Sequence, residues 1–386
     1  MRIQERAEMN IEQASQTFKH HLASPNVSVA DYLNGAMDEI GRKIANRRKL
    51  YLDTRYWVFI REAALGRPRA SEHATILALL RRYVAAGKAV CPVSDVTFME
   101  MTTQTDDVTR LATAELWDEL SLGVALQSEQ DRVQSELAHF FDYPDLASAS
   151  WSMQDRVWAK ACFVLGATVP VNEAASPAAN RAMQKSAIDV LWPTSFVEMA
   201  KKSAAELANK EGFDRTAAQI NADMRRFAHQ VASLEQAFLA EIVGALDVSK
   251  HAVGKVVIDL YEKRGNSLEG VTTEQLNDFH AKTMGMLVNC FRFARKKMAQ
   301  RVPSLYVHAL CHAAIRMDVT RRVNGNFLRD LHHGTAAVAY HDAMFTERPL
   351  EVLLTAGNVA VDKEFDCRVL SAERDVIAYL EGLQAV

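Results

Sequence analysis

The strongest signal for an α/β fold is the segment Asp330-Leu-His-His-Gly-Thr-Ala-Ala-Val-Ala-Tyr-His-Asp342-Ala-Met-Phe-Thr-Glu347. It opens with an acid, continues through small residues typical of a helix, reaches a second acid and ends in a short apolar strand. Far upstream, Lys49-Leu-Tyr-Leu-Asp53-Thr54 also predicts an apolar strand that ends in an acid. In open α/β sheets, the carboxyl ends of the strands face the crevice that binds ligands. We therefore expect acids of both segments to meet at one edge of a sheet.

Acidic residues flank the predicted strand ends in the way that a metal site requires: Asp53, Glu100, Asp330, Asp342 and Glu347. Carboxylate oxygens are the ligands that Mg²⁺ and Mn²⁺ prefer. Without a cation, such acids would repel one another and one of them would become protonated. The acids therefore predict a divalent-metal site and a metal-dependent phosphodiesterase. The residues expected to contact substrate are Thr54, Arg55, Ser94, His333 and Arg348.

Each acid also has an ordinary structural interpretation. Asp53 follows a predicted strand and Asp330 follows Asn324-Gly-Asn326, positions at which an aspartate often caps a helix. Glu100 lies on a predicted helix, where a glutamate usually faces solvent. The joint pattern, rather than any single acid, favours the functional interpretation.

The composition is that of an ordinary globular protein. Of 386 residues, 49% are hydrophobic and 24% charged, and the net charge of −3 restricts nucleic-acid contacts to local basic patches. No run approaches the ~18 apolar residues of a membrane span, and the first residues lack the apolar segment of an export signal. The five cysteines contain no C-x-x-C pair, which is typical of reduced thiols. We expect a cytoplasmic protein without membrane contact.

Hydrophobic periodicity divides the chain into four segments. Residues 1–44 predict helices, and residues 45–107 predict the strand and helix order of a parallel sheet. From 108 to 300 nearly every segment has helical periodicity, and the α/β pattern resumes over 301–386. The predicted fold is an α/β parallel sheet flanked by helices and interrupted by a large all-α insertion. This insertion could be a substrate clamp, a homodimer surface or a docking site for a partner protein.

Three motifs resemble those of the PIN-like nuclease family. They are Tyr-Leu-Asp53-Thr after a strand, Phe-Met-Glu100-Met on a helix, and Asp330-Leu-His-His333-Gly-Thr-Ala-Ala on an Ala-rich helix. The subgroup that ends this helix in Tyr-Cys-Asp and its strand in Thr-Asp is most similar, and the corresponding residues here are Tyr340-His341-Asp342 and Thr346-Glu347. The resemblance covers roughly 45–105 and 300–386, under half of the chain. It implies a PIN-like fold in which acids hold Mg²⁺ or Mn²⁺ and cleave RNA, less often DNA, in a bacterial toxin-like, stress or defence setting.

The chain departs from this family in three places. The segment between Glu100 and Asp330 is much longer than a minimal PIN-like domain allows, Glu347 replaces Asp, and His341 stands where Cys is frequent. The usual fourth acid follows the late strand, so the choice between Asp342 and Glu347 stays open. The favoured function is a metal-dependent endoribonuclease. The alternatives are a nuclease for single-stranded or branched DNA, and a catalytically degenerate scaffold that binds nucleic acid or protein.

Two further patterns have competing interpretations. His308 and His312 are four residues apart, a spacing that suits zinc on one helix face. The segment lacks a protease glutamate and an obvious third ligand, so packed or capping histidines are favoured. Basic clusters occur at 42–49, 292–301 and 321–329. Such clusters are typical of solvated helix faces, although those that border the α/β segments could rim the site and hold a phosphate backbone.

Overall fold

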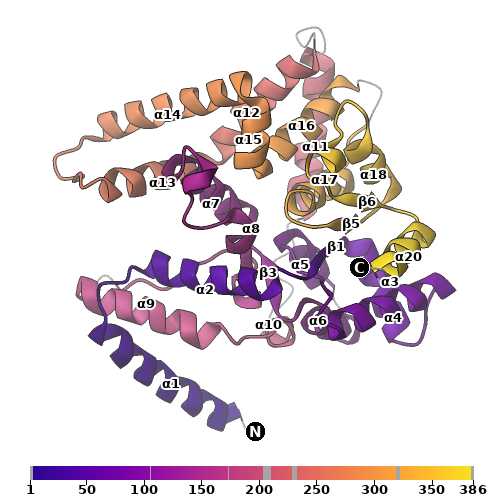
Figure 1. Ribbon diagram of the computed structural model, residues 1–386, viewed down its shortest axis with the longest axis horizontal. Coiled ribbons are helices and arrows are strands. Elements are labelled where there is room, and N and C mark those ends of the chain that lie inside the picture. The colour runs from indigo at the N-terminus through magenta and orange to yellow at the C-terminus, as the bar shows by residue number, and fades with distance from the viewer. Residues whose placement is uncertain are drawn as a thin grey trace.

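The computed structural model of the chain describes residues 3–104, 106–172, 174–202, 210–227, 233–318 and 322–383. It is mostly helical, at 69%, around a four-stranded parallel sheet with the order β2-β1-β5-β6 (Figure 1). The strands are β1 (Arg48–Leu52), β2 (Ala89–Val90), β5 (Ala343–Phe345) and β6 (Arg368–Leu370). The predicted α/β class is confirmed at this level.

The sheet joins segments that are far apart in the sequence. β1 pairs with β5, Leu50 lying opposite Ala343 and Leu52 opposite Phe345. Side chains alternate along β1, so Leu50 and Leu52 pack on one face of the sheet and Tyr51 on the other. Burial of each leucine contributes about 2 kcal/mol. Because the strands are parallel, the residues that follow β1 and β5 reach the same edge.

An additional antiparallel pair of strands lies within the predicted all-α insertion. β3 (Val124–Leu126) pairs with β4 (Trp158–Lys160), and a bridge between Val93 and Ala125 attaches β3 to the segment that follows β2. The all-α prediction is therefore wrong for the region that contains these strands. Each has three residues, and a buried apolar run of that length has no periodicity that distinguishes a strand from a helix.

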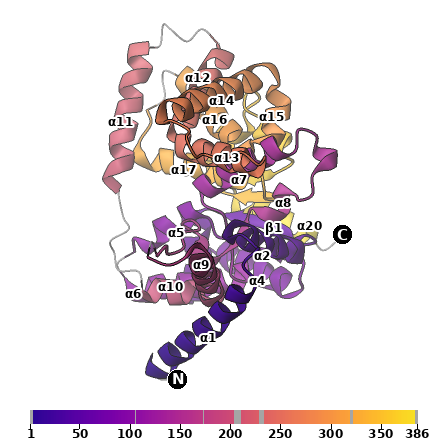
Figure 2. The ribbon, with the colours of Figure 1, turned by 90° about the vertical axis from the view of Figure 1, so that its left-hand side faces the viewer.

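Helices cover both faces of the sheet; in Figures 1 and 2 one group lies below it and the other above it, except α2 (Val29–Ile44), which is drawn below β1. On the face of Leu50 and Leu52 lie α3 (Thr54–Ala64), α4 (Ser71–Ala85), α5 (Asp95–Thr102), α6 (Asp107–Ser121), α10 (Phe196–Lys202) and α20 (Glu373–Gly382). On the face of Tyr51 lie α2, α7 (Glu129–Asp142), α11 (Lys210–Phe227), α12 (Leu234–Val248), α13 (Lys250–Lys263), α14 (Thr273–Phe293), α15 (Arg295–Arg301), α16 (Pro303–Met317), α17 (Gly325–Ala337) and α18 (Arg348–Thr355). The short helices are α8 (Met153–Arg156) and α19 (Val361–Glu364).

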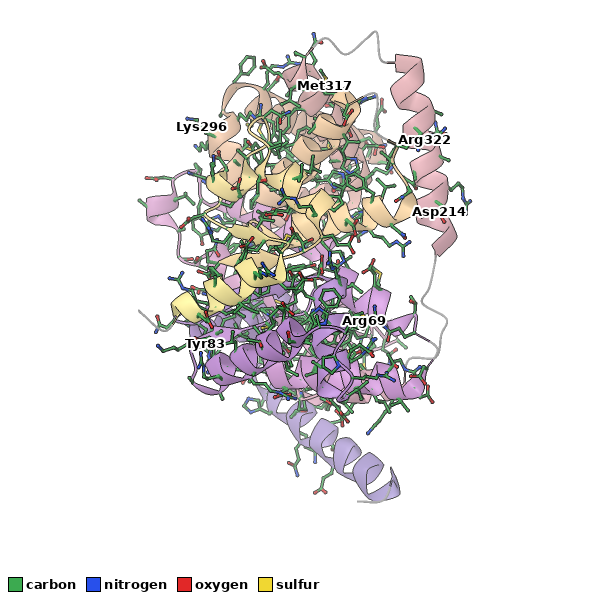
Figure 3. The ribbon with its side chains drawn as sticks, turned by 90° about the vertical axis from the view of Figure 1, so that its right-hand side faces the viewer. Arg69, Tyr83, Asp214, Lys296, Met317 and Arg322 are labelled. Atoms are coloured by element: carbon green, nitrogen blue, oxygen red, sulfur yellow. The ribbon has the colours of Figure 1, made fainter. Side chains whose placement is uncertain are left out.

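Two helices extend from these layers. α1 (Ile3–Ala23) packs on α9 (Pro177–Leu191) and projects away from the body of the molecule (Figure 2). α11, which carries Asp214 in Figure 3, runs along α17. A Cβ on Gly325, the first residue of α17, would lie 2.2 Å from the Asp214 carboxylate, so glycine permits this close approach. Over the described ranges, no helix combines the length and apolar character needed to span a membrane.

Candidate active site

The carboxyl edge of the sheet brings acids from separate segments together. Asp53 follows β1, and its backbone N–H donates to the carbonyl of Phe345 in β5. Its Oδ1 accepts a hydrogen bond from Tyr56 N at 3.2 Å, so Asp53 caps α3. Glu347 follows β5 at the N-cap position of α18, but its side chain makes no capping hydrogen bond. Asp53 therefore has a structural role at this edge, whereas the Glu347 carboxylate is not used as a cap.

Helix α17 presents Asp330 and His333 to the same edge. Asn324 caps this helix by accepting from Phe327 N at 2.8 Å, which excludes Asp330 as the cap. Asp330 and His333 are three residues apart and share one helix face. The neighbouring Gly334 lies against Leu354 of α18, where a Cβ would come within 3.2 Å, so small residues let α17 pack closely.

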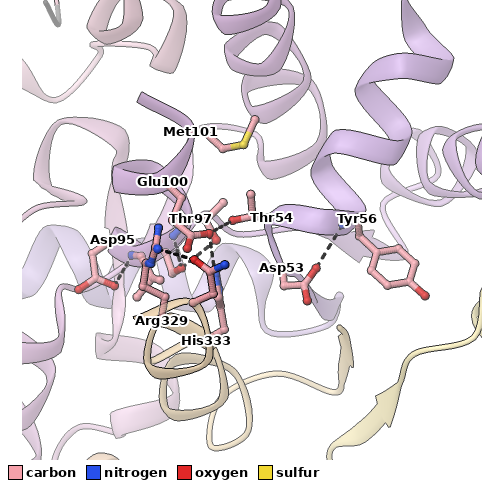
Figure 4. Close-up of polar contacts among 12 residues, drawn as sticks. Asp53, Thr54, Tyr56, Asp95, Thr97, Glu100, Met101, Arg329 and His333 are labelled. Carbon is pink, nitrogen blue, oxygen red and sulfur yellow. Dashed lines mark hydrogen bonds and ion pairs between the residues drawn. The ribbon is translucent and has the colours of Figure 1, made fainter. Parts of the chain in front are cut away.

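The imidazole of His333 lies among these acids (Figure 4). It is buried, with Nε2 3.1 Å from Oε2 of Glu100 and Nδ1 2.6 Å from the Tyr51 hydroxyl oxygen. That hydroxyl lies 2.8 Å from Oγ of Ser94, which places this predicted contact residue at the cluster. Burial lowers the pKa of His333, but Tyr51, Glu100 and Asp53 raise it well above its usual value. We infer an imidazolium that donates from both ring nitrogens.

Glu100 of α5 is held by two donors. The Thr54 hydroxyl and the His333 imidazole both bind its Oε2. Burial opposes the charge of Glu100, but the hydrogen bonds from His333 and Thr54 keep its pKa below the usual value. Arg329 also favours the anion, and Figure 4 shows it near Glu100 and His333. Glu100 is therefore an anion with defined partners rather than a solvated surface residue.

The two aspartates are poorly stabilised as anions. Burial raises the pKa of Asp53 to about 6, His333 opposes this rise and Glu347 adds to it. Burial raises the pKa of Asp330 to about 7, with further contributions from Glu347, Asp53 and Glu100. Within the described part of the chain, no hydrogen bond or ion pair engages the Asp330 carboxylate. Acids placed in this way ionise readily only beside an additional positive charge.

Asp342 lies at the opposite edge of the sheet. It accepts hydrogen bonds from Lys49 N at 2.7 Å and from Arg48 Nη1 at 2.8 Å, both at the start of β1. The strand β5 lies between Asp342 and the carboxyl edge, and each of its residues adds about 3.3 Å along the strand. The prediction that Asp342 belongs to the metal site is wrong, because an acid that precedes a parallel strand reaches the amino edge. Of the two candidates for the fourth acid, Glu347 is the one that lies at the cluster.

The two arginines predicted to contact substrate are bound to acids. Nη2 of Arg55 lies 3.3 Å from Oε1 of Glu373, and Nη1 of Arg348 lies 2.7 Å from Oε2 of Glu351. The arginine beside the cluster is Arg329, which the sequence pattern places only in a basic segment. It donates to Gly325 O at 3.3 Å and to Asn326 Oδ1 at 2.5 Å within its own helix. The signal that could have found it is its spacing, because residues four apart in a helix share one face.

Apart from Arg329, the residues of the basic segments described below lie away from the acids. Arg301 is buried and donates to four backbone carbonyls at and just beyond the carboxyl end of α7, those of His139 at 2.9 Å, Phe140 at 3.2 Å, Tyr143, and Pro144 at 3.4 Å. Arg48 lies at the amino edge of the sheet, and Figure 3 shows Lys296 and Arg322 on opposite sides of the helical part of the molecule. The expectation that these clusters rim the site is wrong for Arg48 and Arg301, because one binds Asp342 and the other caps a helix.

The donor set suits a hard cation, although the side chains are not arranged around one. Asp53, Asp330 and Glu347 offer carboxylate oxygens of the kind that Mg²⁺ and Mn²⁺ prefer. Across the residues that the structure describes, no three His, Cys, Asp or Glu side chains are placed to hold a metal ion as they stand. Metal binding therefore requires side-chain rotation, and in the present arrangement His333 supplies the positive charge.

Comparison of the chain with protein-family models, with curated proteins and with solved structures finds no match.

Proposed function

We propose that the chain is a divalent-metal-dependent phosphodiesterase with a PIN-like fold and a site formed by Asp53, Glu100, Asp330 and Glu347. The observation that carries the proposal is the state of Asp330, whose pKa is raised to about 7 among other acids. Strongly perturbed groups of this kind are concentrated at functional sites. A purely structural acid would be expected to have a hydrogen-bonding partner, as Asp342 has at the other edge of the sheet.

In this proposal the residues of the cluster have different roles. Mg²⁺ or Mn²⁺ held by Asp53, Asp330 and Glu347 would lower the pKa of a bound water and neutralise charge on the scissile phosphate. Glu100 stays ionised through its contacts with Thr54 and His333 and thereby fixes the orientation of the imidazolium.

Arg329 is the group best placed to bind the substrate backbone. It lies beside the cluster on the same helix face as His333, and a guanidinium forms strong charge-assisted hydrogen bonds with phosphate oxygens. This phosphodiester recognition is common to RNA and DNA. The preference for RNA, and the toxin-like, stress or defence role, rest on the PIN-like motifs alone.

A non-cutting scaffold is the second candidate, and the His333–Glu100 pair favours it. With Nε2 3.1 Å from the carboxylate, the imidazolium supplies part of the positive charge that a metal would otherwise provide. In this function the chain binds nucleic acid or protein, and added metal has no effect on the substrate.

Incubation of the purified protein with labelled single-stranded RNA and DNA tests the proposal. Cleavage is expected with Mn²⁺ or Mg²⁺ and not with EDTA. Asp330→Asn should abolish most cleavage because it removes a negative charge from the metal site. Asp342→Asn is the matched control, since it makes the same change in an acid at the opposite edge, and it should cut at nearly the wild-type rate. Binding of RNA without cleavage at any metal concentration would favour the scaffold.

A further inference from the structure

An open-sided cavity of about 630 Å³ is lined by α7, α11, α12, α16 and α17. Its volume falls within the range of roughly 300–1,000 Å³ that small-molecule sites occupy. Much of its lining is apolar, including Val133, Leu305 and Leu328, and a small number of charged side chains enters it. An apolar chamber with a few convergent polar groups is the usual form of a ligand site.

A carboxylate and three imidazoles meet in this lining. Oε2 of Glu129 lies 3.1 Å from Nδ1 of His332, and its Oε1 lies 3.6 Å from Nδ1 of His308. The rings of His308 and His312 are stacked, with centroids 4.4 Å apart and an interplanar angle of 20°. The four side chains come from α7, α16 and α17, so the fold assembles them from three separate segments.

These groups present different charges to the cavity. Burial opposes ionisation of Glu129, but its contacts with His308 and His332 lower its pKa well below the usual value. Burial lowers the pKa of His312 well below its usual value. The lining thus offers an anion, Glu129, and a neutral flat ring, His312.

The cavity also contains a second charged pair. Nη1 of Arg316 lies 2.8 Å from Oε1 of Glu241, and about a quarter of each side chain is exposed. Both donors and acceptors are therefore available beside the apolar surface.

The cavity adjoins the acid cluster. His332, in the cavity wall, directly precedes His333 of the cluster on α17. The backbone N–H of Glu129 donates to Oδ2 of Asp95 at 3.0 Å, and Asp95 directly follows Ser94 of the cluster. A polymer bound at the acids could place one of its units in the cavity.

We propose that this cavity binds a guanine base. The flat stacked imidazoles offer a surface for a base, as aromatic and histidine side chains do in single-stranded RNA recognition. The Glu129 carboxylate has about four lone-pair sites, so it can accept from the two adjacent N–H groups of guanine while it keeps its histidine contacts. Adenine presents an unprotonated ring nitrogen at the equivalent position, which would face the carboxylate unfavourably. Arg316 supplies donors for the guanine carbonyl and ring nitrogens.

A bare metal ion fits these observations less well. An ion held by the three histidines would leave most of the 630 Å³ chamber without contacts. In the described segments, moreover, no three candidate ligands are placed to hold a metal. The organic ligand accounts for both the apolar walls and the charged groups.

The guanine could belong to a free nucleotide or to a bound strand. Binding of a guanine within a strand rests on the proposed function, whereas binding of a free guanine nucleotide does not. Calorimetric titration of the full chain with GMP in EDTA examines the first source alone. A guanine-containing pentanucleotide that competes with GMP, while oligo(U) of the same length does not, would identify a strand as a ligand of the same cavity.

The titration should give a GMP dissociation constant below about 1 mM, with AMP at least about tenfold weaker. Glu129→Gln replaces one acceptor oxygen with a donor and should weaken GMP binding by about tenfold or more. Absence of GMP binding, or equal binding of AMP and GMP, would overturn the proposal. The proposal would also be overturned if the protein bound no nucleotide but bound Zn²⁺ stoichiometrically, and if His308→Ala abolished that Zn²⁺ binding.

Two glycine variants separate a blocked cavity from a damaged fold. Gly244 lines the cavity on α12 and Gly285 lies on α14, and neither would place a Cβ within 4 Å of another atom. Gly244→Trp should lower GMP affinity at least about tenfold through exclusion, and Gly285→Trp should leave it unchanged. Equal affinities in the two folded variants would contradict the assignment.

Asp330→Asn keeps this inference distinct from the proposed function. The variant should bind GMP as tightly as wild type, because Asp330 does not line the cavity. If RNA is cut but GMP is not bound, the cavity assignment fails and the phosphodiesterase proposal stands. If GMP is bound but no nucleic acid is cut with any metal, the reverse holds.

Discussion

Replacing Asp330 with asparagine should stabilise the metal-free protein at alkaline pH, although it removes a proposed metal ligand. The pKa of this carboxyl rises from 3.8 to about 7 in the folded protein, chiefly because of burial. The folded state therefore retains the proton where the unfolded state has lost it. Asp330 stabilises the fold most below pH 3.8, and this contribution is lost as the pH rises toward about 7.

The magnitude follows from the size of this rise. Each pKa unit corresponds to about 1.4 kcal/mol, so a rise of about three units costs about 4 kcal/mol above pH 7. Solvent screening of the partly exposed side chain reduces the expected cost to about 2–4 kcal/mol. Asparagine has no charge to desolvate and loses no hydrogen bond, since none engages Asp330 within the described residues.

Urea denaturation in EDTA measures the effect. Asp330→Asn should raise the free energy of unfolding by about 2–4 kcal/mol near pH 8 and by less than about 2 kcal/mol near pH 5. Added Mn²⁺ should stabilise wild type more than the variant, because a ligand that binds only the folded state stabilises it. A variant that is less stable than wild type at pH 8, or that differs equally at both pH values, would show that burial does not raise the pKa of Asp330. Asp342→Asn provides the comparison, and it should lower stability by about 1 kcal/mol through its lost contact with Arg48.

Three further substitutions separate the roles of other residues. His333→Ala should lower the free energy of unfolding by about 2–3 kcal/mol in denaturant titration, because it leaves buried partners of the imidazole unsatisfied. Arg329→Ala should weaken RNA binding and make its affinity less dependent on salt, whereas Lys296→Ala should not; filter binding at several salt concentrations distinguishes them. Arg301→Met should lower the melting temperature without changing RNA affinity, since Arg301 caps the carboxyl end of α7; equal loss of affinity and stability would contradict that role.

The sequence predicts the main sheet well where strands are apolar and bounded by turns. β1, β5 and β6 arise from such runs, and the parallel pairing of β1 with β5 brings Asp53 and Glu347 to one edge. β3 and β4 cannot be predicted in this way, because a buried run of three residues shows no hydrophobic periodicity. Each is recognisable as a strand only through its pairing with the other in the folded chain.

Only part of the candidate site could be predicted from the sequence, because several of its contacts join residues that are far apart in the chain. Strand polarity alone would have excluded Asp342, because it precedes β5 and thus faces the amino edge. The central position of His333 depends on Tyr51 and Glu100, which lie 282 and 233 residues away in sequence. The Glu129 contacts with His308 and His332 depend likewise on the packing of three helices, which no local pattern encodes.

Anomalous scattering from crystals soaked with Mn²⁺ locates the proposed metal without any substrate. We expect a manganese peak bound by Asp53, Asp330 and Glu347, present in wild type and in Asp342→Asn but absent from Asp330→Asn. A fully soaked crystal with no peak at these carboxylates, or with its peak at Asp342, would contradict the proposed metal-dependent phosphodiesterase.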